Sequence, residues 1–226
     1  MLPRRVPQAA LFVWLLASHF GTSFAQEQNA ASITVAANPA VTFTLDFPIS
    51  APSHYSLRVS QDGKASYESM GKLTPQADGD PFSYGFVMSE ANRARIFALA
   101  AQAKYFEGDV DYKKGHIANT GRKVLAYEDG EQHHEAAYNY STNTAIQQLT
   151  QIFQSISATV ESARRLQYFH HYQKLALEDE LKRMEEMAKS NSLEELQAIA
   201  PVLQAIADDK ATMNVTRARA QRLLAK

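Results

Sequence analysis

The 226-residue sequence contains no cysteine. It therefore has no disulfide framework, no thiol for nucleophilic catalysis and no cysteine that could carry a lipid at a processed N-terminus. The sequence also has no excess of charge of one sign, because 23 basic and 24 acidic side chains leave a formal charge of −1. This balance argues against a dedicated nucleic-acid binder, which usually carries a basic excess.

Motifs for catalysis and cofactor binding are missing as well. The chain has no glycine-rich phosphate loop and no serine nucleophile elbow. Asp109 and Asp111 begin a pattern like that of a calcium loop, but Lys113 and Lys114 follow where oxygen ligands are required. The segment is typical of a charged surface loop. We therefore expect a protein without a cofactor and without catalytic activity.

Residues 1–25 have the order of a secretory signal peptide. A basic pair, Arg4 and Arg5, precedes an apolar run over 9–20 and a small-x-small cleavage site that ends at Ala25. The apolar run is shorter than the roughly 20 residues that cross a bilayer as a helix. We expect cleavage after Ala25, a formal charge of −3, export to the periplasm or the medium, and no membrane span afterwards. An exported chain of this size without disulfides favours a bacterial envelope.

After a loose lead-in over 26–40, apolar and polar residues alternate in the way that indicates half-buried strands. The pairs Asp62-Gly63 and Asp129-Gly130 suit the positive φ angles of tight hairpin turns. The alternation predicts strands over 41–47, 55–61, 64–70, 82–88, 122–128 and 131–140. Antiparallel hairpins are expected.

Helical patterns follow the strands. Ser89 is a suitable N-cap for a helix that runs through Tyr105, and its inward stripe consists of Ile96, Phe97, Ala100 and Ala103. From Thr144, apolar residues recur at steps of three and four, as in a coiled coil. Since no proline or glycine interrupts the chain between Gly130 and Pro201, this pattern predicts an unbroken helix to about Lys189.

A returning helix is expected after Ser190-Asn191. Ser192 and Glu195 have the spacing of a capping box, Pro201 predicts a kink or break, and a basic helical stretch ends the chain over 211–226. The sequence thus predicts an α+β fold. An antiparallel sheet of hairpins with packed helices occupies 41–160, and a long C-terminal helical hairpin occupies 161–226.

The run His133-His134-Glu135 resembles the His-Glu-x-x-His signature of zinc hydrolases, but Tyr138 stands where the second histidine belongs. In a strand, adjacent side chains point to opposite faces, so His133 and His134 do not share a metal. His133 and Glu135 share a face that we expect to be the solvated one, with Ala136, Tyr138 and Tyr140 packed inward. A metal-dependent hydrolase that adds His116 or Asp111 to His133 and Glu135 is the alternative.

Two further surfaces are candidates for function. The long helix leaves Leu166, Phe169, Tyr172 and Leu175 as an apolar strip for a second copy of the chain or an envelope protein, unless Leu223 and Leu224 fold back and seal it. The aromatic side chains of the sheet either form core or bind a small envelope ligand. These aromatic side chains are Phe82, Tyr84, Phe86, Tyr138 and Tyr140.

The hairpin over Tyr55–Glu68, with its Tyr-Ser-Leu, Asp-Gly and Tyr elements, is followed by a helix that ends at Tyr105-Phe106 and by a second Asp-Gly hairpin. This arrangement resembles exported bacterial α+β domains of unknown function over about Tyr55–Ile156. Members often carry a Cys-Pro pair before the first strand, where this chain has Ala51-Pro52. The resemblance implies an exported α+β unit and no catalytic residues. We expect an exported, non-catalytic interaction or structural module.

Overall fold

The computed structural model describes residues 38–73, 79–130 and 132–226. The predicted signal peptide, its cleavage site at Ala25 and almost all of the lead-in lie outside the described residues.

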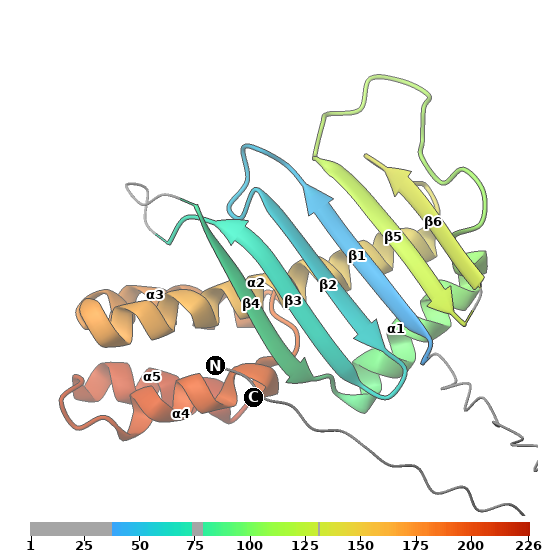
Figure 1. Cartoon of the computed structure of the whole chain (residues 1–226). Coiled ribbons are helices and arrows are strands. Elements are labelled where there is room, and N and C mark those ends of the chain that lie inside the picture. Colours follow the sequence, from blue (N-terminus) through green and yellow to red (C-terminus); the bar gives the residue numbers. More distant parts are fainter. Residues whose placement is uncertain (1–37, 74–78, 131) are drawn as a thin grey trace, which may run out of the picture. The chain divides into compact units, whose positions relative to one another are not determined.

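Six strands form one antiparallel sheet in the order β4-β3-β2-β1-β5-β6 within the described part of the chain (Figure 1). The strands are β1 (Ala40–Asp46), β2 (His54–Ser60), β3 (Lys64–Gly71), β4 (Asp80–Val87), β5 (Arg122–Asp129) and β6 (Gln132–Tyr138). The six predicted strands are confirmed with small shifts at their ends.

Alternation along β1, β2 and β3 creates one buried face and one more exposed face. In β1, Phe43 is fully buried and pairs with Leu57 of β2 and Leu125 of β5. The turn between β2 and β3 places Gly63 at φ +90°, a conformation that L side chains rarely adopt. The expected Asp-Gly turn therefore forms, and it sets the register of the first hairpin.

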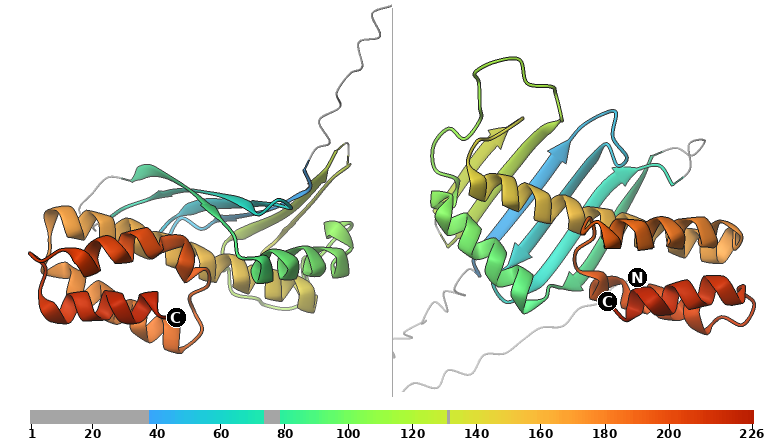
Figure 2. Two further views of the ribbon diagram at one scale, coloured as in Figure 1. Left: turned by 90° about the horizontal axis from the view of Figure 1, so that it is seen from below. Right: turned by 180° about the vertical axis from the view of Figure 1, so that it is seen from behind.

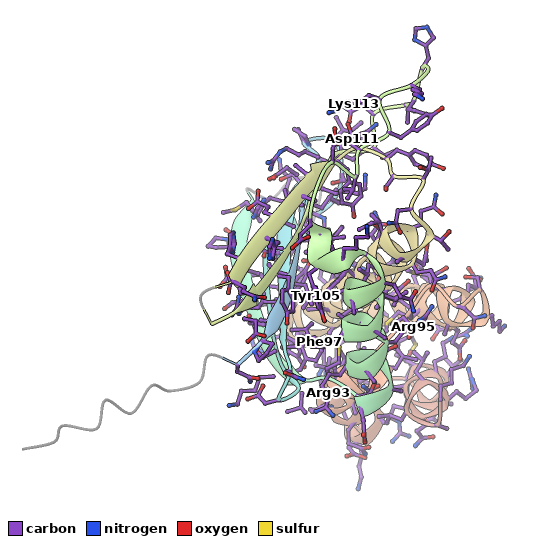
Figure 3. All side chains as sticks on the ribbon, turned by 90° about the vertical axis from the view of Figure 1, so that its right-hand side faces the viewer. Arg93, Arg95, Phe97, Tyr105, Asp111 and Lys113 are labelled. Atoms are coloured by element: carbon purple, nitrogen blue, oxygen red, sulfur yellow. The ribbon has the colours of Figure 1, made fainter. Side chains whose placement is uncertain are left out.

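Two helices cover the buried face of the sheet, and the other face carries no helix in the described residues (Figure 2). They are α1 (Glu90–Gln102) and the first part of α2 (Thr144–Tyr172). Ser89 caps α1, as predicted, by accepting a hydrogen bond from the backbone N–H of Asn92. Figure 3 shows Phe97 on the sheet side of α1 and Arg95 on the opposite side. The predicted inward stripe of α1 is confirmed.

The helix predicted through Tyr105 ends earlier, at Gln102. Lys104, Tyr105 and Phe106 all have positive φ angles and form the short 3-10 turn η1 (Lys104–Phe106). This turn buries the Phe106 side chain completely. Burial of one aromatic ring thus accompanies three unfavourable backbone conformations.

The prediction of one unbroken helix to Lys189 is wrong. The chain leaves the helix at Gln173, and α3 (Ala176–Lys189) runs back along the second half of α2. Arg165 Nε bonds Glu180 Oε1 at 3.0 Å, while Arg183 Nη2 lies 3.4 Å from Ser162 Oγ, which fixes the antiparallel direction. Turning back at this point buries the apolar side of α3, namely Leu177, Leu181 and Met184.

The predicted capping box is also wrong. Glu195 does not cap its own helix; it adopts a left-handed conformation with φ 61°, and its carboxylate accepts bonds from Ser89 N at 2.9 Å and Asn92 Nδ2 at 2.7 Å. It therefore caps α1 from more than 100 residues away. A carboxylate at a helix N-terminus is stabilised by the unpaired N–H groups there.

The remaining helices are η2 (Leu196–Ile199), α4 (Ala200–Asp208) and α5 (Asn214–Leu224). Pro201 lies in the first turn of α4, where its missing N–H is tolerated, so the predicted break at Pro201 is confirmed. Among the described residues, no helix combines the length and apolar character needed to cross a membrane.

Buried apolar residues form two clusters that share one helix. The sheet cluster extends along α2 to Val160, and the helical cluster begins on the same helix at Ala163. The helical cluster joins the second part of α2 with α3, α4 and α5. The α+β fold with a packed C-terminal helical region is thus as the sequence predicts.

Candidate functional site

One end of the helical region is formed by two turns. The first joins α2 to α3 over 173–175, and the second joins α4 to α5 over 209–213. The side chain of Asp209 holds them together. Its Oδ2 accepts a bond from Lys174 Nζ at 2.6 Å and lies 2.9 Å from Nε2 of His170.

Asp209 is also bonded within its own turn, by the backbone N–H of Ala211 at 2.9 Å and the hydroxyl of Thr212 at 3.0 Å. The bond from Lys174, the backbone N–H of Ala211 and the contact with His170 together hold the pKa of Asp209 well below its usual range. The charged carboxylate is therefore part of the folded arrangement of the two turns.

Large apolar side chains are exposed at this same end. Tyr172 is 68% exposed, Leu175 80%, Met213 45% and Val215 49%. Val215 belongs here because its neighbour Thr216 bonds Glu178 in the first turn of α3. We call these four side chains the tip surface. Exposed apolar groups of this size gathered at one end are typical of an interaction site.

The structure divides the predicted apolar strip. Leu166 is fully buried and Phe169 is partly buried in the helical cluster, where Leu223 is also buried. Only Tyr172 and Leu175 of the predicted strip remain in solvent. Leu166 and Phe169 are therefore covered, as expected if Leu223 folds back on the strip. Tyr172 and Leu175 stay exposed and are joined by Met213 and Val215, which were not predicted from the sequence.

The histidines of β6 lie on different faces, as the strand pattern predicts. His133 and Glu135 are exposed, and His133 Nδ1 is 3.7 Å from the carboxylate of Glu128. Ala136 and Tyr138 are buried, but Tyr140 is 40% exposed, contrary to the expectation that it packs inward. Among the described residues, no three histidine or acidic side chains gather where they could hold a metal ion.

The aromatic side chains of the sheet are mostly packing elements. Ring contacts run from Tyr55 through Tyr67, Phe82 and Tyr84 to Phe86, at centroid distances of 5.8 to 6.3 Å. The rings of β4 rest on the sheet cluster. Tyr138 and Tyr140 line a cavity of about 170 Å³ beside the start of α2. The aromatic residues of β4 are thus core neighbours, while Tyr138 and Tyr140 border open space.

A buried lysine, Lys123, also lines the cavity beside Tyr138 and Tyr140. Lys123 is only 4% exposed, and its Nζ donates to Asn139 O at 2.8 Å and Thr120 Oγ1 at 2.9 Å. Burial lowers the pKa of Lys123. This contact ties the loop over 107–121, which carries Asp111 and Lys113 (Figure 3), to the end of β6. The signal in the sequence is a lysine in an inward position of β5, which the sequence analysis did not use.

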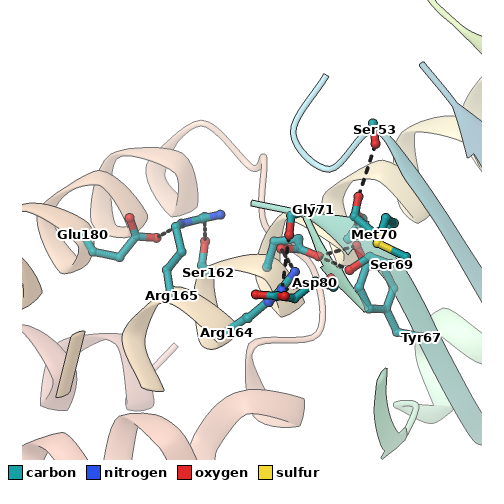
Figure 4. A network of polar contacts seen from close by, with 12 residues as sticks. Ser53, Tyr67, Ser69, Met70, Gly71, Asp80, Ser162, Arg164, Arg165 and Glu180 are labelled. Atoms are coloured by element: carbon teal, nitrogen blue, oxygen red, sulfur yellow. Dashed lines mark hydrogen bonds and ion pairs between the residues drawn. The ribbon is translucent and has the colours of Figure 1, made fainter. Parts of the chain in front are cut away.

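A polar network lies between α2 and the sheet (Figure 4). Glu161 Oε1 accepts bonds from Tyr67 Oη at 3.0 Å and Ser69 Oγ at 2.6 Å. Arg164 Nη2 donates to the carbonyl oxygens of Gly71 and Asp80, at 3.3 and 3.2 Å. Burial, and next the charge of Glu161, raise the pKa of Tyr67, so its hydroxyl stays a donor. The sequence gives no sign of this network, because its members are spread over three elements.

Comparison of the chain with known protein families and with curated protein sequences finds no match.

Proposed function

We propose that the protein is an exported, non-catalytic interaction module of the bacterial envelope and that the tip surface is its contact region. The observation that carries the proposal is the exposure of Tyr172, Leu175, Met213 and Val215 at one end of the helical region. The ion pair between Lys174 and Asp209 keeps the two turns together. The two turns that carry the exposed apolar side chains are therefore held in a fixed arrangement. The resemblance to exported bacterial α+β domains is consistent with this role.

The proposed partner is a second copy of the chain. A two-fold axis at the tip lets each apolar surface cover the same surface of the other copy, and such symmetric contacts are the commonest in soluble oligomers. Four side chains supply less area than the about 800 Å² per partner of stable interfaces. The association is therefore expected to be weak and to depend on protein concentration.

Light scattering over a range of protein concentrations tests the proposal. We expect the wild type to associate and the variant Leu175→Glu to do so at least about tenfold more weakly, because a charge replaces an apolar contact. Ile49→Glu is the matched control, since Ile49 is 86% exposed in the loop after β1. Association of Ile49→Glu should equal that of the wild type.

A wild type that stays monomeric at about 1 mM would rule out self-association. Cross-linking in envelope extracts, with Leu175→Glu as the negative control, then shows whether a different protein occupies the tip surface. If neither experiment detects a partner, the interaction function is wrong and the helical region only completes the fold.

Export has a separate test. If residues 1–25 are a signal peptide, the intact mass of protein recovered from the envelope corresponds to a chain that begins at Gln26. Replacing Ala25 with a bulky residue should slow processing, since the cleavage site requires small side chains. A recovered mass that still includes Met1 to Ala25 would contradict the proposed cleavage.

A further inference from the structure

A cavity of about 280 Å³ lies at the end of the sheet where α2 and α3 meet the loop between β1 and β2. The walls combine charged, polar and apolar groups from five segments of the chain. The charged residues that line it are Glu161 and Arg165 of α2 and Arg183 of α3. Sites for drug-sized ligands occupy about 300 to 1,000 Å³, so this cavity suits a smaller molecule. It shares no residue with the tip surface.

The negative wall of the cavity is Glu161. Its side chain is 9% exposed, and its Oε1 accepts hydrogen bonds from the hydroxyls of Tyr67 and Ser69, while Oε2 forms a longer ion pair with Arg164. Oε2 lies 3.9 Å from Arg164 Nη1 and makes no hydrogen bond with the described residues. A carboxylate oxygen accepts up to two bonds. One acceptor on the cavity wall is therefore open to a donor from a ligand.

The positive wall consists of Arg165 and Arg183. Both pair with Glu180, through Arg165 Nε at 3.0 Å and Arg183 Nη2 at 2.6 Å (Figure 4 shows Arg165 and Glu180). Arg165 Nη2 donates to Ser162 at 3.1 Å, while its Nη1 has no partner among the described residues. Each guanidinium has five N–H donors. Each nitrogen of Arg183 already has a partner, in Glu180, Ser162 or Met187, so Nη1 of Arg165 is the nitrogen left for a second carboxylate.

The two walls are separated although the sequence would let them pair. Glu161 precedes Arg165 by four residues on α2, the spacing at which a glutamate and a following basic residue form an ion pair on a helix. Here Glu161 accepts a hydrogen bond from Ser69 of the sheet and Arg165 bonds Glu180 of α3, so the two side chains do not hydrogen-bond each other although both line the cavity. A ligand with one charge would satisfy one wall only. A ligand with both charges matches both walls without adding net charge to the site.

We propose that this cavity binds a small zwitterion of the α-amino acid class. The ligand ammonium group donates to Glu161 Oε2, and the ligand carboxylate accepts from Arg165 Nη1 beside the positive charge of Arg183. The hydroxyl of Tyr55 and the amide of Gln154 supply further polar contacts, and Leu45, Pro52 and Ala158 form the apolar part of the wall. Burial raises the pKa of Tyr55, so its hydroxyl remains protonated.

Binding is tested with the standard free amino acids as probes, by thermal shift and then by calorimetry on the purified protein. We expect at least one of them to raise the melting temperature at millimolar concentration. Its N-acetyl derivative and its carboxamide, each lacking one of the two charges, should bind at least about tenfold more weakly. If no free amino acid binds, or if the N-acetyl derivative binds as tightly as the parent, the proposal is overturned.

Variants on α3 assign the binding to this cavity. Arg183→Gln removes a cation from the wall, and we expect the dissociation constant to rise by about tenfold. Lys182→Gln removes the same charge from the adjacent, exposed position and should leave binding unchanged. Equal effects of the two substitutions would show that binding occurs elsewhere. Glu161→Gln keeps the side-chain shape. It should weaken the binding of the parent amino acid but not the binding of its N-acetyl derivative.

Discussion

At the scale of single residues, the buried charges of α2 are stabilised by different partners. Arg164 is 6% exposed, and its guanidinium carbon lies 4.9 Å from the ring centre of Phe82. Its Nη1 has no hydrogen-bond partner among the described residues. The aromatic face of Phe82 and the nearby carboxylate of Glu161 compensate the positive charge of Arg164 instead of a hydrogen bond. If one side chain of the network around Glu161 and Arg164 is removed, the remaining polar groups stay buried and lack a hydrogen-bond partner.

Tyr67 is the residue at which this dependence is simplest to measure. Tyr67→Phe keeps the buried ring but removes the hydroxyl that bonds Glu161 at 3.0 Å. We expect the free energy of unfolding to fall by about 1 to 3 kcal/mol, because a charged acceptor loses a donor. Urea denaturation followed by circular dichroism measures the change. Tyr172→Phe removes an exposed hydroxyl and should change stability by less than about 0.5 kcal/mol; a similar loss in both variants would contradict the assignment.

At the scale of elements, long-range contacts between helix ends hold the helical region in place. Glu195 caps α1, and Asp209 joins the end of α2 to the turn before α5. Neither contact follows from the local sequence, since each acidic residue bonds an element far away in the chain. Both depend on a charged carboxylate, which accepts more and stronger hydrogen bonds than a neutral one. Stability of these joints is therefore expected to depend on pH.

Asp209 offers a defined test of this pH dependence. Its folded-state pKa is lowered, chiefly by the bond from Lys174. A lowered folded-state pKa adds stability above the unfolded pKa of about 3.9, and this stability is lost as the pH falls through the folded value. Asp209→Asn should therefore be less stable than the wild type at neutral pH, and the difference should shrink below about pH 4.

Urea unfolding at a series of pH values gives this comparison. Asp179→Asn serves as the control, because Asp179 is an exposed aspartate on α3. Its stability should follow that of the wild type at each pH. A difference between wild type and Asp209→Asn that stays constant down to about pH 2 would show that the charge of Asp209 does not stabilise the fold.

At the scale of the whole molecule, α2 belongs to both apolar clusters. Phe153 is buried in the sheet cluster, and Leu166 is buried in the helical cluster. A rigid helix that contributes to two cores couples their unfolding, because neither core keeps its full set of contacts after the helix is lost. The sheet and the helical region are therefore expected to unfold together.

Leu166→Ala tests this coupling. We expect it to lower the free energy of unfolding by about 2 to 5 kcal/mol through the lost side chain and the cavity it leaves. Far-ultraviolet and near-ultraviolet circular dichroism should report the same single, shifted transition. Leu175→Ala, at a position 80% exposed, is the control with little expected change. Two separate transitions in Leu166→Ala would show that the clusters unfold independently.

The sequence alone determined the strands and the α+β class. Alternation reports which side of a strand is buried, and Val41, Phe43 and Leu45 show it without reference to any other segment. The cap at Ser89 is equally local. Strand pairing across the Asp-Gly turns follows from the same residues, since a two-residue turn leaves the chain no other neighbour. The separation of His133 from His134 was likewise predictable from strand geometry.

Only the tertiary structure decided where the long helical pattern turns, what Glu195 binds and which apolar residues stay in solvent. No glycine or proline marks the turn at Gln173; burial of Leu177 against the helical cluster determines it. Leu166 and Leu175 look alike in sequence, yet one is buried and the other is 80% exposed. Periodicity identifies an apolar face but not the element that covers it, because that choice depends on contacts between distant segments.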